Sequence, residues 1–337
     1  MERCLGGEMI EAIYSNVKGR IDLQFASPYN LIYGRNGSGK SSIIHSIELG
    51  AFDTAFDAAG KDVRSKADLR FLAPRGAELY CHLIVDGEEV DWGDRSNRFD
   101  NVVSMAMDAL TGGHSRLVEF LLQHMDDDDH PIALNVPGWD AQVRRHGSYR
   151  KALVSVQKWA ASELRSAQKR VRELNIAIGY MCSYHIYIPD EAEKALAEAE
   201  AEIVKFRDIK LQVETEALIF VKGAFDSLED SINRYLPEQI GRAEFSETGG
   251  RIRLGIGGGV VVPSGVETVA LAVALAGALL GGPRALFILP DRAYDPITLG
   301  RVMRCLRNVP CAGVFVQTTV LPEDYDFMSL GWDLVRA

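Results

Sequence analysis

The glycine-rich stretch GRNGSGKS, residues 34–41, restricts the fold more than any other part of the sequence. A short apolar run at 29–33 precedes it, and apolar residues at helical spacing follow it from Ser41 to Ala51. A strand, a glycine turn and a helix in this order, with Gly-Lys-Ser at the end of the turn, satisfy the P-loop pattern. The sequence therefore predicts an α/β domain in which this turn meets phosphate groups.

Each residue type in the turn has a chemical reason to be there. Glycines let backbone N–H groups wrap around phosphate oxygens, and the start of the following helix adds a favourable dipole. Lys40 is placed to reach the β- and γ-phosphates, and the hydroxyl of Ser41 can hold Mg²⁺. The residues expected to bind the nucleotide here are Asn36, Gly37, Ser38, Gly39, Lys40, Ser41 and Ser42.

The middle third of the chain has the pattern of a helical hairpin. Apolar residues step by threes and fours from Leu153 to Ile178, and the stepping resumes at Leu196 after a break at 179–189. The first helix is about 30 residues long, or roughly 45 Å. We expect a short antiparallel coiled coil at 148–236 that separates two halves of one α/β head, 1–147 and 237–337.

Composition narrows the class of protein. Hydrophobic residues make up 47% and charged residues 25%, which is typical of a globular protein. The longest apolar run, 269–280, is shorter than a membrane span, and no secretion signal opens the sequence, so we expect a cytoplasmic protein with no membrane partner. Five scattered cysteines predict reduced thiols. The net charge of -10 excludes a uniformly basic surface but leaves room for a local basic stripe.

Two further regions indicate sheets. Asp86-Gly87 is a strong hairpin signal and predicts an antiparallel element around it. In the last third, the apolar strands expected at 285–289 and 313–317 alternate with helices, which predicts a parallel sheet covered on both faces.

The segment Pro263-Ser264-Gly265-Val266-Glu267 stands before a long apolar helix. A serine hydroxyl and a glycine amide at a helix N-terminus can form an anion-binding site. The same residues also fit a plain helix start, with Ser264 as N-cap and Glu267 completing a capping box. Both interpretations can hold together.

The P-loop variant with Asn36 before Gly37-Ser38-Gly39 resembles that of ABC-type ATPases. The longer stretch LQFASPYNLIYGRNGSGKSSIIHSIELGAF resembles the opening of RecF, of the structural-maintenance-of-chromosomes (SMC) proteins and of the zinc-hook ATPase of double-strand-break repair. In that family a coiled coil separates the two halves of the site. The resemblance implies an ABC-ATPase-type P-loop head, with a mixed sheet, an antiparallel subdomain and an inserted short antiparallel coiled-coil hairpin, that binds ATP and Mg²⁺.

The resemblance also assigns the second half of the site. The family's Leu-Ser-Gly-Gly-Glu signature corresponds to 263–267, so Ser264 and Gly265 would cap the phosphate held by the other subunit of an ATP-bridged homodimer, and Glu267 is a further candidate nucleotide-binding residue. The metal-side aspartate would be Asp291, which shares Mg²⁺ with Ser41.

Two positions depart from the family pattern at the residues of hydrolysis. Arg292 stands where a glutamate normally polarises the attacking water, and Thr319 stands where a switch histidine is expected. The candidate catalytic residues are then Asp291 and Asp295, of which Asp295 takes part of the base's role or belongs to a loop at the dimer interface. Loss of a general base costs about 10²- to 10⁴-fold in rate. We expect ATP binding with slow or absent hydrolysis.

The resemblance implies a role in DNA recombination, repair or maintenance, with DNA as a partner. A second hypothesis is an ATP-sensing regulatory or assembly subunit of a nuclease or antiviral defence complex that does not bind DNA directly. At the hairpin tip, Cys182 and His185 have the spacing of two metal ligands, while the apolar residues around them favour a tip that docks on protein.

Overall fold

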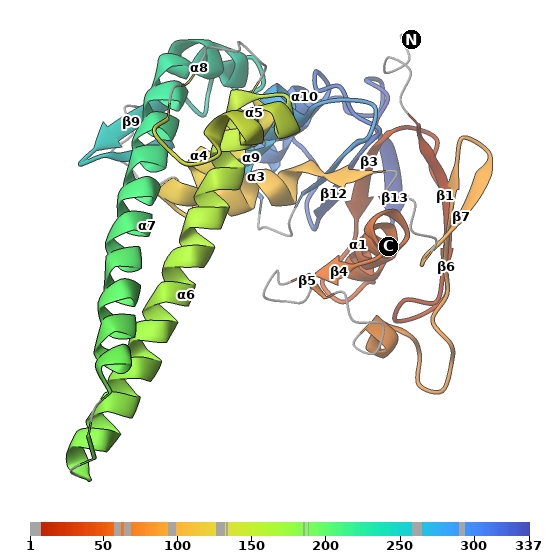
Figure 1. Ribbon diagram of the computed structural model, residues 1–337. Helices are drawn as coiled ribbons and strands as arrows, with labels where there is room; N and C mark the ends of the chain where they lie inside the picture. Colours follow the sequence, from red (N-terminus) through yellow and green to blue (C-terminus); the bar gives the residue numbers. More distant parts are fainter. Residues whose placement is uncertain are drawn as a thin grey trace. The chain divides into compact units, whose positions relative to one another are not determined.

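The computed structural model describes residues 8–56, 62–63, 69–93, 99–125, 132, 134–184, 186–187, 189–257, 265–289 and 294–337. The chain divides into two compact units (Figure 1). The first comprises Met1–Arg116 and Asp226–Ala337, and the second comprises Leu117–Phe225. The two ends of the sequence therefore build one unit, and the middle of the sequence builds the other.

A parallel sheet in the first unit carries the glycine-rich turn. Its strand order is β13-β3-β12-β11-β8, and every neighbouring pair is parallel. The strands are β3 (Tyr29–Tyr33), β8 (Asp100–Asn101), β11 (Ala285–Leu289), β12 (Gly313–Thr318) and β13 (Asp333–Arg336). All residues of β11 and β12 are buried, which explains why both strands are apolar nearly throughout instead of alternating.

An antiparallel sheet forms the other layer of this unit, in the order β2-β1-β6-β7. Its strands are β1 (Ile10–Ser15), β2 (Ile21–Gln24), β6 (Cys81–Val85) and β7 (Glu88–Asp91). Asp86 and Gly87 join β6 to β7 with φ values of 48° and 80°. Two consecutive positive φ values are what a two-residue type I′ hairpin needs, so the hairpin predicted from Asp-Gly is confirmed.

Helix α1 (Lys40–Phe52) packs against both sheets and contacts β1, β6 and β12. A single cluster of buried side chains joins the three layers and includes Ile47 of α1, Leu83 of β6 and Phe315 of β12. At Gly50 the helix comes so close to β6 that a Cβ atom would lie 2.6 Å from Cγ of Leu83. Glycine at this position therefore sets the distance between α1 and the antiparallel sheet.

Polar contacts also tie α1 to this sheet. The hydroxyls of Ser46 and Ser15 lie 2.6 Å apart, and the Cys81 thiol donates to the carbonyl oxygen of Ser46. Burial raises the pKa of Cys81 to about 12. Among the described residues, Cys81, Cys182, Cys305 and Cys311 are not in disulfides.

The remaining elements of the first unit surround these layers. Helix α9 (Gly265–Leu280) is buried from Val269 to Gly277 and packs against α3 (Val102–Thr111), β10 and β11. Its burial explains the long apolar run of the sequence. The other elements are β4 (Ala55–Phe56), β5 (Asp62–Val63), the 3-10 helix η1 (Arg70–Leu72), α8 (Phe225–Asn233), β9 (Ala243–Thr248), β10 (Arg251–Ile256) and α10 (Pro296–Leu306).

The second unit is helical. It contains most of α4 (His114–His124), α5 (Trp139–His146), and the long helices α6 (Tyr149–Ser183) and α7 (Asp190–Gly223). Helices α6 and α7 run side by side as the predicted hairpin (Figure 1). The unit's limits of 117 and 225 differ from the expected 148 and 236. At its start, Ile132, Val136 and Trp139 share a core with α6 and α7, while at its end α8 pairs with β9 through Glu229.

The seam between α6 and α7 follows the predicted positions. Buried residues facing each other include Val156 and Ala160 of α6 and Val213 of α7. The break predicted at 179–189 begins later than expected, because α6 continues through Gly179 to Ser183 and is 35 residues long. A glycine inside a helix costs only about 1 kcal/mol relative to alanine, which by itself is too little to end a long helix.

The structure confirms the predicted fold class, a mixed α/β head with an antiparallel sheet and an inserted helical hairpin. None of the helices in the described ranges combines the length and the apolar character that a membrane crossing requires.

Candidate nucleotide-binding site

The glycine-rich turn connects the end of β3 to the start of α1. Gly37 and Gly39 have φ values of 82° and 108°, which only glycine adopts without strain. Gly34 has a different constraint, since a Cβ there would lie 2.3 Å from the Ser38 hydroxyl. The residues from Arg35 to Ser38 are exposed, so the turn faces solvent.

Lys40, the first residue of α1, is 5% exposed. Its ammonium group donates to the carbonyl oxygens of Gly34 (2.8 Å) and Arg35 (3.0 Å). These two hydrogen bonds hold the ammonium group of Lys40 beside the turn. If a phosphate were bound there, its oxygens would replace the two carbonyl oxygens as partners of the ammonium group. Ser41 follows in the first helical turn and is exposed, and Ser42 is half-buried. The predicted phosphate-binding residues therefore lie together on one turn at the N-terminus of one 13-residue helix.

The strands next to β3 frame the turn. The N–H of Gly34 donates to the carbonyl oxygen of Thr318 at the end of β12 (3.2 Å). Thr318 is paired with Tyr33, and its own hydroxyl bonds to both the N–H and the C=O of Val320. Thr319 is exposed directly after the strand. The position at which the family has a switch histidine thus adjoins the start of the glycine-rich turn.

Gln317 is a polar residue of β12 that sequence reasoning did not single out. It is 6% exposed, and no partner for its Oε1 atom exists in the described part of the chain. It pairs with Ile32 and lies two residues after Phe315, both of which belong to the cluster packed on α1. Side chains two residues apart share a face of a strand, so Gln317 faces the side of the sheet on which α1 and the turn lie.

Asp295 was predicted as a catalytic carboxylate, and the structure gives it a structural task. It is the N-cap of α10, and its Oδ1 accepts from the backbone N–H of Thr298 at 2.9 Å. Hydrogen bonds from Thr298 lower the pKa of Asp295, so the carboxylate is ionised at neutral pH. The cap accounts for the residue, while its part in catalysis stays a prediction.

The second half of the predicted site is described in part. Gly265 begins α9 and is exposed, and Glu267 lies in the first turn of that helix. Ser264, Asp291 and Arg292 lie outside the described residues. At the hairpin tip, Cys182 is exposed in the last turn of α6, and His185 lies outside the described residues.

Residues 12–101, which contain the glycine-rich turn, match a family model described as an AAA domain. No curated protein matches the chain. Among solved structures, the recombination mediator protein RecF with ATP has a TM-score of 0.41 at 15% identity, covering 93% of this chain and 92% of that chain. The SMC head domain with an extended coiled coil from Pyrococcus furiosus, bound to the C-terminal domain of ScpA, also has a TM-score of 0.41 at 15% identity, covering 98% and 93%.

An SMC head domain with a coiled coil and joint from Pyrococcus yayanosii has a TM-score of 0.37 at 12% identity, covering 92% of each chain. At such TM-scores these likenesses are loose. The family match depends on the segment that holds the turn itself, where β3, the positive-φ glycines and Lys40 have the P-loop arrangement. The match to the AAA domain model is therefore limited to residues 12–101, the segment that contains the glycine-rich turn.

Proposed function

We propose that this chain is the ATP-binding head of an ATPase of the RecF and SMC kind, which dimerises around ATP and acts in DNA recombination, repair or maintenance. The observation that carries the proposal is the P-loop, with Lys40 held by two carbonyl oxygens over a solvent-exposed turn. An exposed glycine-rich turn at a helix N-terminus, with one buried ammonium group beside it, is suited to bind a polyphosphate.

Magnesium fits the residues that are present. The Ser41 hydroxyl is exposed in the first turn of α1, next to the phosphates that Lys40 would hold. A small cation that prefers oxygen ligands would bridge this hydroxyl and the nucleotide, with Asp291 as the second protein group on the metal side. The metal would neutralise phosphate charge.

The dimer is proposed because the N-terminus of α9, on the same unit, is a second candidate anion-binding site. Gly265 is exposed at the first position of the 16-residue helix α9, so the positive end of the helix dipole at this N-terminus would attract an anion. In the proposed dimer, Ser264 and Gly265 of one copy cap the γ-phosphate bound by Lys40 of the other copy, and Glu267 orients this turn.

Hydrolysis is proposed to be slow. Arg292 replaces the expected base, Thr319 replaces the expected histidine, and the carboxylate of Asp295 is engaged in capping α10. Nucleotide binding needs only the P-loop, whereas rapid hydrolysis needs a base near the attacking water. The protein would then change state mainly by binding and releasing ATP.

The test is size analysis of the purified chain by light scattering, with and without ATP and Mg²⁺. We expect a monomer without nucleotide and a dimer with it. Lys40→Ala should weaken the dimer because it weakens ATP binding, and Ser264→Arg should abolish the dimer while the monomer still binds ATP. A Ser264→Arg protein that dimerises like the parent would contradict the split site.

The second candidate, an ATP-sensing subunit of a nuclease or defence complex, is favoured by Arg292 and Thr319, since a sensor needs no rapid turnover. DNA binding separates the two candidates. ATP-dependent binding that weakens steeply with salt supports the first, because contacts to phosphates release counterions. No DNA affinity, together with a stable complex with a nuclease, supports the second.

A further inference from the structure

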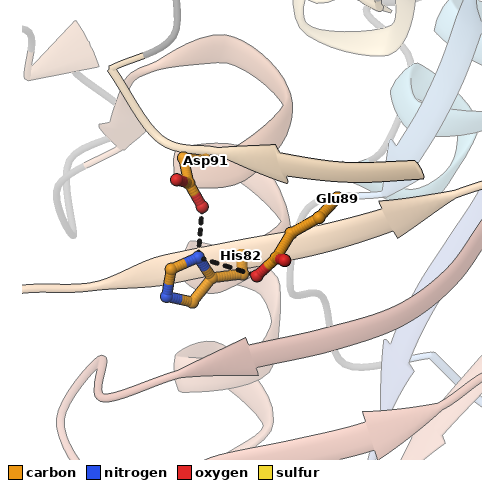
Figure 2. Close-up of side chains that lie close together, drawn as sticks. All are labelled: His82, Glu89 and Asp91. Carbon is orange, nitrogen blue, oxygen red and sulfur yellow. Dashed lines mark hydrogen bonds and ion pairs between the residues drawn. The ribbon is translucent and has the colours of Figure 1, made fainter.

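His82, Glu89 and Asp91 bring one imidazole and two carboxylates together on the β6–β7 hairpin (Figure 2). One candidate ligand atom from each residue lies within 4.8 Å of those of the other two. The Nδ1 atom of His82 is 3.5 Å from Oε1 of Glu89 and is hydrogen-bonded to Oδ1 of Asp91. The group belongs to the antiparallel sheet and is separate from the P-loop residues.

The pairing of the strands explains why the three side chains meet. His82 is directly opposite Asp91, and Ile84 is opposite Glu89. Glu89 and Asp91 are two residues apart and therefore share one face of β7. The alternate residues of β6, Cys81 and Leu83, are buried in the core, so His82 points to the opposite, open face. The register of the hairpin fixes the group without any loop.

The hairpin is held at both of its ends. At the turn, Oδ1 of Asp86 accepts from the N–H of Met9 (3.1 Å), and Glu11 accepts from the N–H of Gly87 (2.9 Å). At the open end, the indole N–H of Trp92 donates to the carbonyl oxygen of Leu79 (3.3 Å). A ligand set on such a support loses little backbone entropy when it binds an ion.

The charges of the group are unbalanced. Within the described ranges, no Lys or Arg side chain forms an ion pair with Glu89 or Asp91, and each has His82 as its ion-pair partner. The two carboxylate side chains are 66% and 61% exposed and the imidazole is 33% exposed, so an ion from solvent can reach all three. The two carboxylates carry negative charge that a dication would neutralise.

We propose that His82, Glu89 and Asp91 bind a transition-metal dication. The imidazole with its proton on Nε2 offers the lone pair of Nδ1, and each carboxylate offers one oxygen. Zinc bonds of about 2.0 to 2.2 Å place tetrahedral ligand atoms roughly 3.3 to 3.6 Å apart. The distance of 3.5 Å between His82 and Glu89 already matches this, and the ion takes the place of the His82–Asp91 hydrogen bond.

The ligand set also selects the kind of metal. A nitrogen with two oxygens suits Zn²⁺, Fe²⁺, Co²⁺ or Mn²⁺, whereas Mg²⁺ and Ca²⁺ prefer oxygen alone. Three protein ligands leave at least one coordination position for water or for an oxygen of a bound molecule. The site is therefore distinct in chemistry from a Mg²⁺ site at the nucleotide.

Zn²⁺ and Co²⁺ are the probes for the test, added to the full chain without nucleotide. Calorimetry with Zn²⁺ should show one high-affinity equivalent per chain, and bound Co²⁺ should show the visible absorption of mixed nitrogen and oxygen coordination. We expect His82→Ala and Asp91→Asn each to weaken Zn²⁺ binding by at least about tenfold, since even the loss of a group that only orients a ligand has this effect.

The matched controls remove one charge or one thiol elsewhere. Glu88→Gln changes a carboxylate one residue before Glu89, on the other face of β7, and Cys182→Ser removes the exposed thiol of the hairpin tip. Both should bind Zn²⁺ like the parent, and thermal unfolding should show that all variants fold. Absence of stoichiometric binding, or affinity that is unchanged in both His82→Ala and Asp91→Asn, would overturn the proposal.

Discussion

Helices α1 and α9 both begin after a glycine-containing segment, yet their N-termini are built differently. The first turn of α1 has no acidic residue, its N-cap Gly39 is in the left-handed region, and Lys40 adds a positive charge. The first turn of α9 carries Glu267. A carboxylate at this position satisfies the helix dipole from within and opposes an incoming anion. Under the proposed function, the start of α1 is thus suited to bind a phosphate by itself, and the start of α9 is less suited.

This difference gives an order of events under the proposed function. The N-terminus of α9 would bind a free nucleotide too weakly to hold it. It could still contact a phosphate that another copy has already bound and partly neutralised with Lys40 and Mg²⁺. ATP would bind to the P-loop first, and the dimer would form second. The dimer would then depend on the γ-phosphate.

The largest expected effect is on the rate of ATP hydrolysis, for which neither helix N-terminus supplies a general base. Arg292→Glu should raise the steady-state turnover of ATP by about 10²-fold or more, because it places a base where the family has one. Phosphate release measures the rate. Arg292→Gln is the matched control, since it removes the positive charge without supplying a base. Equal turnover in the two variants would show that the base lies elsewhere.

Lys40→Ala should weaken ATP binding by about 10- to 150-fold, the equivalent of about 1.5 to 3 kcal/mol for hydrogen bonds to a charged group. Titration with a fluorescent ATP analogue measures the affinity. Lys151→Ala removes the same charge from an exposed position on α6 and should have no effect. An unchanged ATP affinity in Lys40→Ala would contradict the conclusion that the start of α1 is the stronger phosphate-binding site of the two helix N-termini.

Asp295→Ala should lower the free energy of unfolding by about 1 kcal/mol, the usual value of a helix N-cap. Hydrogen bonding lowers the pKa of Asp295, so this stabilisation is present at neutral pH and is lost as the pH falls through the lowered native pKa. Urea denaturation at several pH values measures it. Asp295→Asn keeps the cap, and a drop in its ATP turnover would indicate a catalytic carboxylate.

Glu267→Gln should have the smallest effect. If α9 meets a phosphate, removing the carboxylate should strengthen ATP-dependent dimerisation by about two- to fivefold, or about 0.3 to 1 kcal/mol. Light scattering at graded protein concentrations measures the dimer. Glu238→Gln, at an exposed position, is the control. A fall in thermal stability without any change in the dimer would instead favour a plain capping box.

Local signals predicted the parts of the fold that depend on few residues. The P-loop, the Asp86-Gly87 turn and the seam of the hairpin each follow from short-range steric or periodic rules, and the structure has all three. The cap of α10 could also have been found, since Asp295 followed by Pro296 and Thr298 is a regular helix start.

Other features depend on contacts between distant segments. Gln317 looked like one more residue of an apolar strand, and only the pairing of β12 with β3 shows that its side chain is buried facing α1. The group of His82, Glu89 and Asp91 follows from the register of β6 with β7. The two-residue turn allows that register to be counted in the sequence, but nothing in the sequence shows which face is open.

The close approach at Gly50 packs helix α1 directly against the antiparallel sheet. Leu83 fills the space where a side chain of Gly50 would be, and Ser46 is tied to Ser15 and Cys81 on the same sheet. Tightly packed interiors transmit displacement and absorb little of it. A displacement of α1 would therefore be passed on to β1 and β6 and would not be absorbed between the helix and the sheet.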